Sequence, residues 1–146
     1  MAALHPTPRS SRRPLIWIVA VLLLAVTGLL APGLLEANTK DSDGSRMQAR
    51  KITFPSTHQD SLDPPDDRAD WRYFKLTEQT SLTIKATLAD SEAGAKLRLM
   101  DAGGDELAGA SARNGEAALS KQVDAGVYYI SIEAASKTDY SLSLRE

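Results

Sequence analysis

Five aspartates lie close together near the middle of the chain, and clustered carboxylates are the usual ligands of calcium. They are Asp60, Asp63, Asp66, Asp67 and Asp70. Calcium takes about six to eight oxygen ligands and tolerates irregular geometry, so these residues are candidate calcium ligands. Their spacing fits no defined calcium-binding loop, and the Asp and Pro residues among them also favour turns in a solvated acidic linker. The sequence favours the linker and leaves calcium as the one cofactor with candidate ligands.

A second group of side chains, the aromatic residues beyond residue 70, could bind a sugar or a peptide. Tyr128 and Tyr140 alternate in phase with apolar neighbours, so we expect them in the core. Trp71, Tyr73 and Tyr129 have the opposite phase, which makes them candidate surface residues for binding. The sequence favours packing or edge-covering roles for these five residues over a binding role, because aromatic side chains supply much of the buried area of a small core.

Catalysis has little support in the sequence. The chain has no cysteine and two histidines, of which His5 precedes a long apolar run and His58 lies in a Pro- and Asp-rich segment. The common nucleophile and zinc-binding motifs are absent. The formal net charge of −2 gives no electrostatic support for a nucleic-acid partner. We therefore expect neither an enzyme nor a nucleic-acid-binding protein.

The N-terminal segment has the pattern of an export signal or a membrane anchor. Residues 1–14 contain three arginines and no acid, and residues 15–31 form an uninterrupted apolar run that we expect to be helical. This run is shorter than the roughly 20 residues of a typical membrane-spanning helix. Residues 1–37 are thus predicted to be a basic flank followed by either a cleaved signal peptide or a retained anchor. Either alternative places the remainder outside the cytoplasm: in the periplasm, secreted, or held at the membrane.

Residues 38–69 read as a disordered polar linker between this segment and a folded domain. The stretch is rich in Asp, Pro and Ser and shows neither helical nor strand periodicity over most of its length. Residues 51–54 are the exception, because two apolar residues flank a threonine there. We predict a short edge strand at that point, so that the domain itself begins either at residue 70 or near residue 50.

From residue 70 onward, apolar side chains recur at every second position, which predicts strands with one buried and one wet face. The pattern is clearest in residues 81–88, 96–101, 126–132 and 139–145. Glycine-containing turns separate the runs, among them residues 101–105 and the pair Asn114-Gly115, which favours tight turns. The absence of an intervening helical pattern predicts an all-β antiparallel sandwich over residues 70–146.

Four segments of this region, taken in order, resemble the bacterial pre-peptidase C-terminal domain. They are residues 70–76 (DWRYFKL), 97–108 (LRLMDAGGDELA), 124–132 (DAGVYYISI) and 139–144 (DYSLSL). That family has an Asp-Trp strand, a strand that ends in an Asp-x-x-Gly turn, a Gly-x-Tyr-Tyr strand and a final strand that contains tyrosine. The resemblance covers about residues 50–146, although Arg72 stands where an aromatic residue is common.

The resemblance implies a jelly-roll-like β-sandwich that is non-catalytic and belongs to a secreted or envelope protein. Such domains are usually appended to an enzyme, which this chain does not contain, and some of them bind polymers or calcium. We therefore expect a non-catalytic exported module of the bacterial cell envelope that acts in protein interaction or accessory binding. The alternative is a calcium-stabilised domain that binds a carbohydrate or a protein polymer.

Overall fold

Nine β-strands and one short 3₁₀ helix form in residues 42–146, the part of the chain that the computed structural model describes. The elements are η1 (Arg46–Gln48), β1 (Arg50–Lys51), β2 (Ser56–Leu62), β3 (Ala69–Leu76), β4 (Thr80–Leu88), β5 (Lys96–Met100), β6 (Glu106–Ser111), β7 (Glu116–Val123), β8 (Gly126–Glu133) and β9 (Thr138–Arg145). None of the helical structure in residues 42–146 has the length and apolarity of a membrane-spanning helix. The segment predicted to be a signal peptide or anchor lies outside the described residues, as do residues 38–41.

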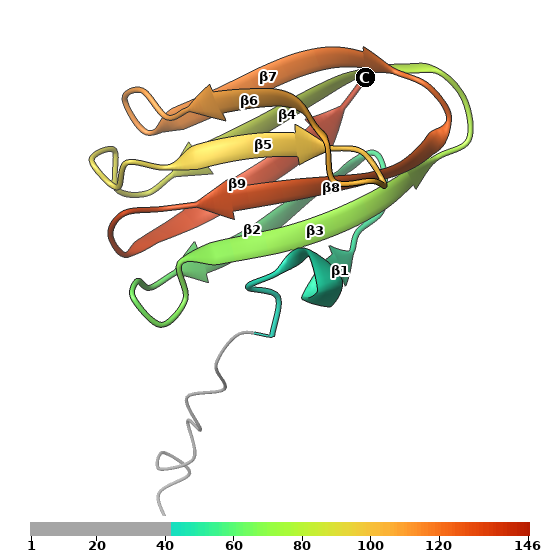
Figure 1. Ribbon diagram of the computed structural model, residues 1–146. Helices are drawn as coiled ribbons and strands as arrows, with labels where there is room; N and C mark the ends of the chain where they lie inside the picture. Colours follow the sequence, from blue (N-terminus) through green and yellow to red (C-terminus); the bar gives the residue numbers. More distant parts are fainter. Residues whose placement is uncertain (1–41) are drawn as a thin grey trace, which may run out of the picture. The chain divides into compact units, whose positions relative to one another are not determined.

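The strands form two sheets that pack face to face (Figure 1). We call the sheet with the order β1-β3-β8-β5-β6 sheet A, and the sheet with the order β2-β9-β4-β7 sheet B. All strand pairs in them are antiparallel except β1 with β3. The predicted all-β antiparallel sandwich is therefore confirmed.

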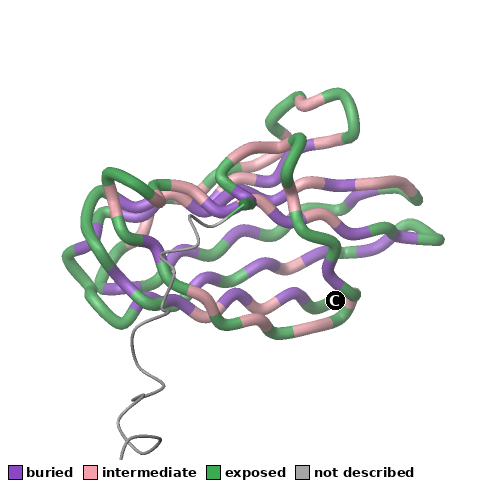
Figure 2. Tube along the Cα trace, turned by 90° about the horizontal axis from the view of Figure 1, so that it is seen from below, coloured by how far each residue is buried: buried purple, intermediate pink, exposed green. Residues whose placement is uncertain are grey.

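The core lies between the sheets and is filled by the alternating apolar residues of the sequence pattern. Buried and exposed positions alternate along the strands in Figure 2. The inward-facing residues predicted from the sequence are all buried: Leu82, Ile84, Ala86, Leu88, Leu97, Leu99, Tyr128, Ile130, Ile132, Tyr140, Leu142 and Leu144. Because a shift of one residue would expose each of these sets, burial specifies the phase of β4, β5, β8 and β9.

Two predicted turns form, but the one at Asn114-Gly115 is not the hairpin turn that this pair of residues favours. Gly104 has φ +97° in the turn between β5 and β6, a conformation that glycine adopts without steric cost. Asn114 and Gly115 both have positive φ, +52° and +77°, in a tight turn closed by Arg113 and Glu116. This second turn does not make a hairpin within one sheet, because it leads from the edge of sheet A to the edge of sheet B. Among consecutive strands of the described residues, β5 and β6 are the pair that shares a sheet.

The prediction of a disordered linker is wrong for residues 56–62, which form strand β2. This strand pairs with β9 over its full length, from Ser56 opposite Leu144 to Leu62 opposite Thr138. It lies at the edge of sheet B, where one neighbour is enough to hold the backbone and polar side chains are tolerated. Leu62 is its one fully buried side chain. The backbone hydrogen bonds to β9 therefore stabilise a strand here, although the amino-acid composition is typical of a disordered tether.

The predicted edge strand of residues 51–54 occurs as β1, at the edge of sheet A, but it comprises Arg50 and Lys51 only. The backbone N–H of Ile52 still donates a hydrogen bond of 2.8 Å to the carbonyl of Tyr73. Phe54 then turns inward and stacks on Phe74, with ring centroids 5.9 Å apart. The first strand of the sandwich thus begins at residue 50.

Replacement of Leu62 by alanine tests whether β2 belongs to the folded unit. Deletion of a fully buried leucine costs about 2–5 kcal/mol, whereas Gln59→Ala on the exposed side of the same strand should change stability by about 0.5 kcal/mol or less. Urea denaturation of both variants, followed by circular dichroism, measures the difference. Equal midpoints for the two variants would show that residues 56–62 are not part of the cooperative unit.

Candidate functional site

The five predicted calcium ligands lie at different places in the described structure. Asp60 and Asp70 point toward the side chain of Arg72, at 2.5 Å and 3.6 Å from its Nη2. Asp63 and Asp67 pair with each other through their backbones, and Asp63 also binds the Lys137 ammonium at 2.6 Å. Asp66 is exposed. Among the described residues, no group of three or more His, Cys, Asp and Glu side chains is placed to hold a metal ion together.

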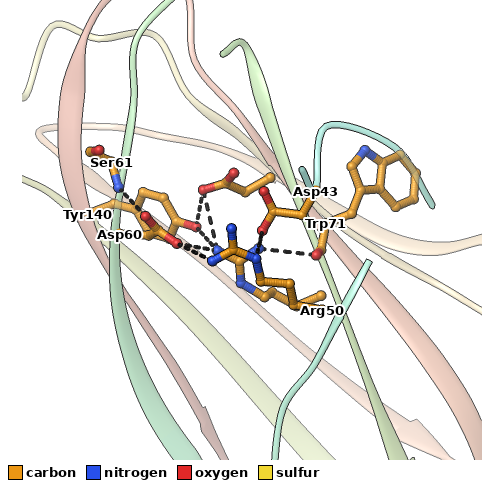
Figure 3. A network of polar contacts seen from close by, with 8 residues as sticks. Asp43, Arg50, Asp60, Ser61, Trp71 and Tyr140 are labelled. Atoms are coloured by element: carbon orange, nitrogen blue, oxygen red, sulfur yellow. Dashed lines mark hydrogen bonds and ion pairs between the residues drawn. The ribbon is translucent and has the colours of Figure 1, made fainter. Parts of the chain in front are cut away.

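Arg72 is the centre of a buried ionic network that the sequence did not reveal (Figure 3). Its side chain is 5% exposed and lies on the inward face of β3, in phase with Asp70 and Phe74. Nη1 forms an ion pair with Asp43 and donates a 3.1 Å hydrogen bond to the carbonyl of Trp71. Nη2 reaches Asp60 on β2. The guanidinium therefore joins sheet A, sheet B and the segment that precedes η1.

Two further side chains complete the network. The Tyr140 hydroxyl donates a 2.5 Å hydrogen bond to Asp70 Oδ2 and accepts a 3.3 Å hydrogen bond from Arg72 Nη2. Arg50 approaches from the rim of the sandwich, with Nε 3.3 Å from Asp43 Oδ2 and Nη1 4.0 Å from Asp60 Oδ2. Three carboxylates thus surround two guanidinium groups. The arginines supply two fixed positive charges against the three carboxylates, which offsets most of the cost of placing these carboxylates in a largely buried site.

Burial raises the pKa of Tyr140 well above the usual value for a tyrosine, and the neighbouring Asp70 carboxylate raises it further. Asp70 acts both through its charge and by accepting the phenol proton in a hydrogen bond, while Arg72 acts in the opposite direction. The phenol therefore stays protonated in the folded protein. In this state it can donate to Asp70, so that the network keeps its hydrogen bond over a wide pH range.

The three predicted binding residues lie together on the outer face of sheet A. Trp71 and Tyr73 belong to β3, and Tyr129 lies directly opposite Tyr73 on β8, with ring centroids 5.9 Å apart. All three are partly exposed, as their phase in the sequence predicts. In Figure 3 the Trp71 indole points away from the ionic network. We call these three side chains the aromatic face.

One residue of the aromatic face has a partner that the sequence did not suggest. Arg46 of η1 places its guanidinium carbon 5.7 Å from the centroid of the Tyr129 ring, within the range of a cation–π contact. Its Nη1 also donates a 3.4 Å hydrogen bond to the carbonyl of Ala102 in the β5–β6 turn. A Cβ atom on Gly104 would lie 2.3 Å from this Nη1, so glycine there leaves room for the arginine.

The outer face of sheet B has a different character. A groove of about 430 Å³ runs over it and is lined by hydroxyl-bearing and basic side chains of β2, β4 and β9: Thr57, Thr83, Lys85, Thr87, Ser141, Ser143 and Arg145. No aromatic side chain lines this groove. Lys85 is paired with Glu116 at 2.6 Å. The two outer faces of the sandwich therefore offer different surfaces to a partner.

Comparison with solved structures identifies the fold. The pre-peptidase C-terminal domain of a collagenase from Bacillus anthracis is similar, with a TM-score of 0.60 and 19% sequence identity over 66% of this chain and 94% of that one. The described domain thus has the fold of a pre-peptidase C-terminal domain, which confirms the resemblance seen in the sequence. Neither a protein-family model nor the sequence of a curated protein matches the chain.

More distant likenesses extend to other β-sandwiches. A periplasmic inhibitor of g-type lysozyme from Aeromonas hydrophila superposes with a TM-score of 0.38 at 12% identity, over 66% of this chain and 99% of that one. A carbohydrate-binding module of lichenase 5A from Cellvibrio mixtus gives 0.39 at 16% identity, over 62% and 86%. These superpositions are too loose to support an argument about function.

Replacement of Arg72 by methionine should destabilise the protein by about 3–5 kcal/mol, because it leaves Asp43 and Asp70 buried without their main counter-charge. Arg98→Met is the matched control. Arg98 pairs with Glu133 at 3.0 Å on the outer face, where an ion pair contributes about 0–1 kcal/mol. Urea denaturation at pH 7 measures both. Similar losses for the two variants would contradict a central role for Arg72.

The raised pKa of Tyr140 predicts a loss of stability in alkali. The unfolded chain ionises this tyrosine above about pH 10, whereas the folded state keeps it protonated. The contribution of Tyr140 is therefore fully present below pH 10, and each further pH unit removes about 1.4 kcal/mol from the free energy of unfolding.

Denaturation curves between pH 8 and pH 12 measure this slope, and Tyr140→Phe should show a shallower one. The variant also loses the hydrogen bond to Asp70, so the comparison concerns the slopes and not the absolute stabilities. Equal slopes for the two proteins would mean that Tyr140 ionises in the folded state.

Proposed function

We propose that this protein is an exported, non-catalytic binding module of the bacterial cell envelope, and that it holds an extracellular protein or polymer on the aromatic face. The observation that carries the proposal is the position of Trp71, Tyr73 and Tyr129. They are side by side on the outer face of one sheet, partly exposed, although the sandwich does not need them in its core. Aromatic side chains with one accessible side are common in binding surfaces, because they offer a large contact area at a small entropic cost.

Export is supported by the sequence of residues 1–37, with its basic flank and apolar run. The domain begins soon after that segment and carries no cysteine that would need a redox partner. The fold likeness to a domain of a bacterial collagenase supports an accessory role. The partner we propose is an envelope or extracellular protein or polymer.

A hydrolytic role finds no support in the one histidine of the described residues. His58 Nε2 lies 2.9 Å from Ser56 Oγ, which superficially resembles a nucleophile with its base. The Ser56 hydroxyl, however, donates a 2.5 Å hydrogen bond to the carbonyl of Thr53. His58 then donates to Ser56 and cannot accept its proton. The pair thus stabilises the start of an edge strand.

The alternative is a calcium-stabilised polymer-binding domain. It requires a calcium ion, and not an arginine, as the counter-charge of the acidic residues. In the described structure the carboxylates of Asp43, Asp60 and Asp70 face Arg72, and Arg50 adds a second positive charge beside Asp43 and Asp60. We therefore propose that binding does not depend on calcium.

The test is retention of the protein on immobilised polysaccharides and envelope proteins. Trp71→Ala and Tyr129→Ala should each weaken retention about tenfold or more, as loss of an aromatic anchor does at an interface. Thr83→Ala and Ser141→Ala, on the outer face of sheet B, are the controls and should bind as the natural protein does. Retention should persist in EDTA. Loss of binding in EDTA would favour the calcium-stabilised alternative, and unchanged binding by the aromatic variants would contradict the proposal.

A further inference from the structure

The outer face of sheet A is basic in a domain that is acidic as a whole. Residues 42–146 contain 13 Lys and Arg against 17 Asp and Glu. The outward positions of sheet A, together with Arg46, nevertheless carry five basic side chains and two acidic ones. The basic residues are Arg46, Lys51, Lys75, Lys96 and Arg98, and the acidic ones are Glu106 and Glu133. This face thus has a surplus of three positive charges.

The outer face of sheet B has no such surplus. Lys85 and Arg145 are balanced there by Glu116 and Asp139. The positive charge therefore coincides with the aromatic residues. This coincidence points to a ligand that needs both.

The basic residues surround the aromatic face and are largely free to bind. Lys51 lies opposite Tyr73 on β1, and Lys75 follows Tyr73 on the same side of β3. Neither of them, nor Lys96, forms an ion pair with another residue in the described part of the chain. Arg98 is different, because Glu133 and Glu106 hold it in place.

Arg46 covers one of the three aromatic rings and leaves the other two accessible. Its guanidinium stacks over Tyr129, which leaves the rings of Trp71 and Tyr73 as the platform for stacking. A guanidinium carries five N–H donors and suits planar carboxylates. The face therefore has a stacking platform beside a cluster of cations that includes Arg46 and Lys51.

We infer that the ligand of this face is an acidic polysaccharide, whose sugar rings stack on Trp71 and Tyr73 while its carboxylates bind Arg46 and Lys51. This inference rests on the proposed function of the aromatic face and names its ligand class. A sugar ring has an apolar side for the aromatic platform, and its hydroxyl edge remains in water. The acidic remainder of the domain repels polyanions, so that attraction is confined to this face.

An anionic membrane surface fits the same charges less well. Such binding requires apolar side chains that enter the interface, and the aromatic residues are partly buried in the sheet. Met47 is the one large apolar side chain that is strongly exposed among the described residues, and it lies on η1.

The experiment compares binding of the full chain to polygalacturonate and to the same polymer with its carboxylates methyl-esterified. Calorimetry at low ionic strength should show binding to the acid that is at least about tenfold tighter than binding to the ester, and that weakens with added salt. The double variant Arg46→Gln/Lys51→Gln should lose about tenfold in affinity for the acid. The control Lys85→Gln/Arg145→Gln removes two cations from sheet B and should leave binding unchanged.

Several outcomes would overturn the inference: equal affinity for the acid and the ester, equal losses in the two double variants, or tighter binding of polyglutamate, oligothymidine or phosphatidylglycerol vesicles. The failure of the inference is distinguishable from failure of the proposed function. If Trp71→Ala abolishes retention on another polymer or protein while polygalacturonate does not bind, the aromatic face is a binding site for a different ligand. If Trp71→Ala and Tyr129→Ala change no binding at all, the proposed function fails as well.

Discussion

A single buried guanidinium joins side chains of both sheets to the segment that precedes η1. On one side of the sandwich, the turn at Asn114 and Gly115 leads directly from β6 to β7, so the two sheets are linked by the chain itself. On the other side lie β1, β2 and β3, where the chain crosses from sheet A to sheet B and back, and side chains add a further link. Arg72 on β3 binds Asp60 on β2 and Asp43 ahead of η1. Without this cation, the three carboxylates would keep only Arg50, at the rim, as a counter-charge, at a cost of several kcal/mol.

The same network positions the aromatic face. Asp43 not only binds Arg72 but also accepts, through its backbone carbonyl, a 2.9 Å hydrogen bond from the N–H of Trp71. The segment that begins at Asp43 continues into η1, from which Arg46 reaches over Tyr129. On the inward side of β3, Arg72 binds Asp43 and so anchors the segment that leads into η1. The outward side of β3 carries Trp71 and Tyr73. One strand thus carries both the central residue of the ionic network and two residues of the aromatic face.

The two outer faces illustrate how a sandwich can separate binding from folding. Inward positions carry the core, so outward positions can vary without loss of the fold. Sheet B uses them for threonines, serines and balanced charges, whereas sheet A uses them for aromatic rings and a surplus of basic residues. The likeness of this fold to a collagenase domain at 19% identity shows how little of the sequence the architecture requires. The function of such a domain therefore depends on the side chains of its outer faces and not on the fold.

The sequence by itself determined the phase of β4, β5, β8 and β9, because hydrocarbon side chains at every second position have to share one side of a strand. It also made Trp71, Tyr73 and Tyr129 candidate surface residues, because their phase is opposite to that of their apolar neighbours, and the structure places all three on the outer face. Tertiary structure decided what local patterns could not express. The polar segment of residues 56–62 became a strand because β9 offers it a row of backbone hydrogen bonds. Arg72 became buried because Asp43 and Asp60, distant in the sequence, supply its counter-charges. Ion pairs of this kind depend on distance in space, for which a one-dimensional pattern has no signal.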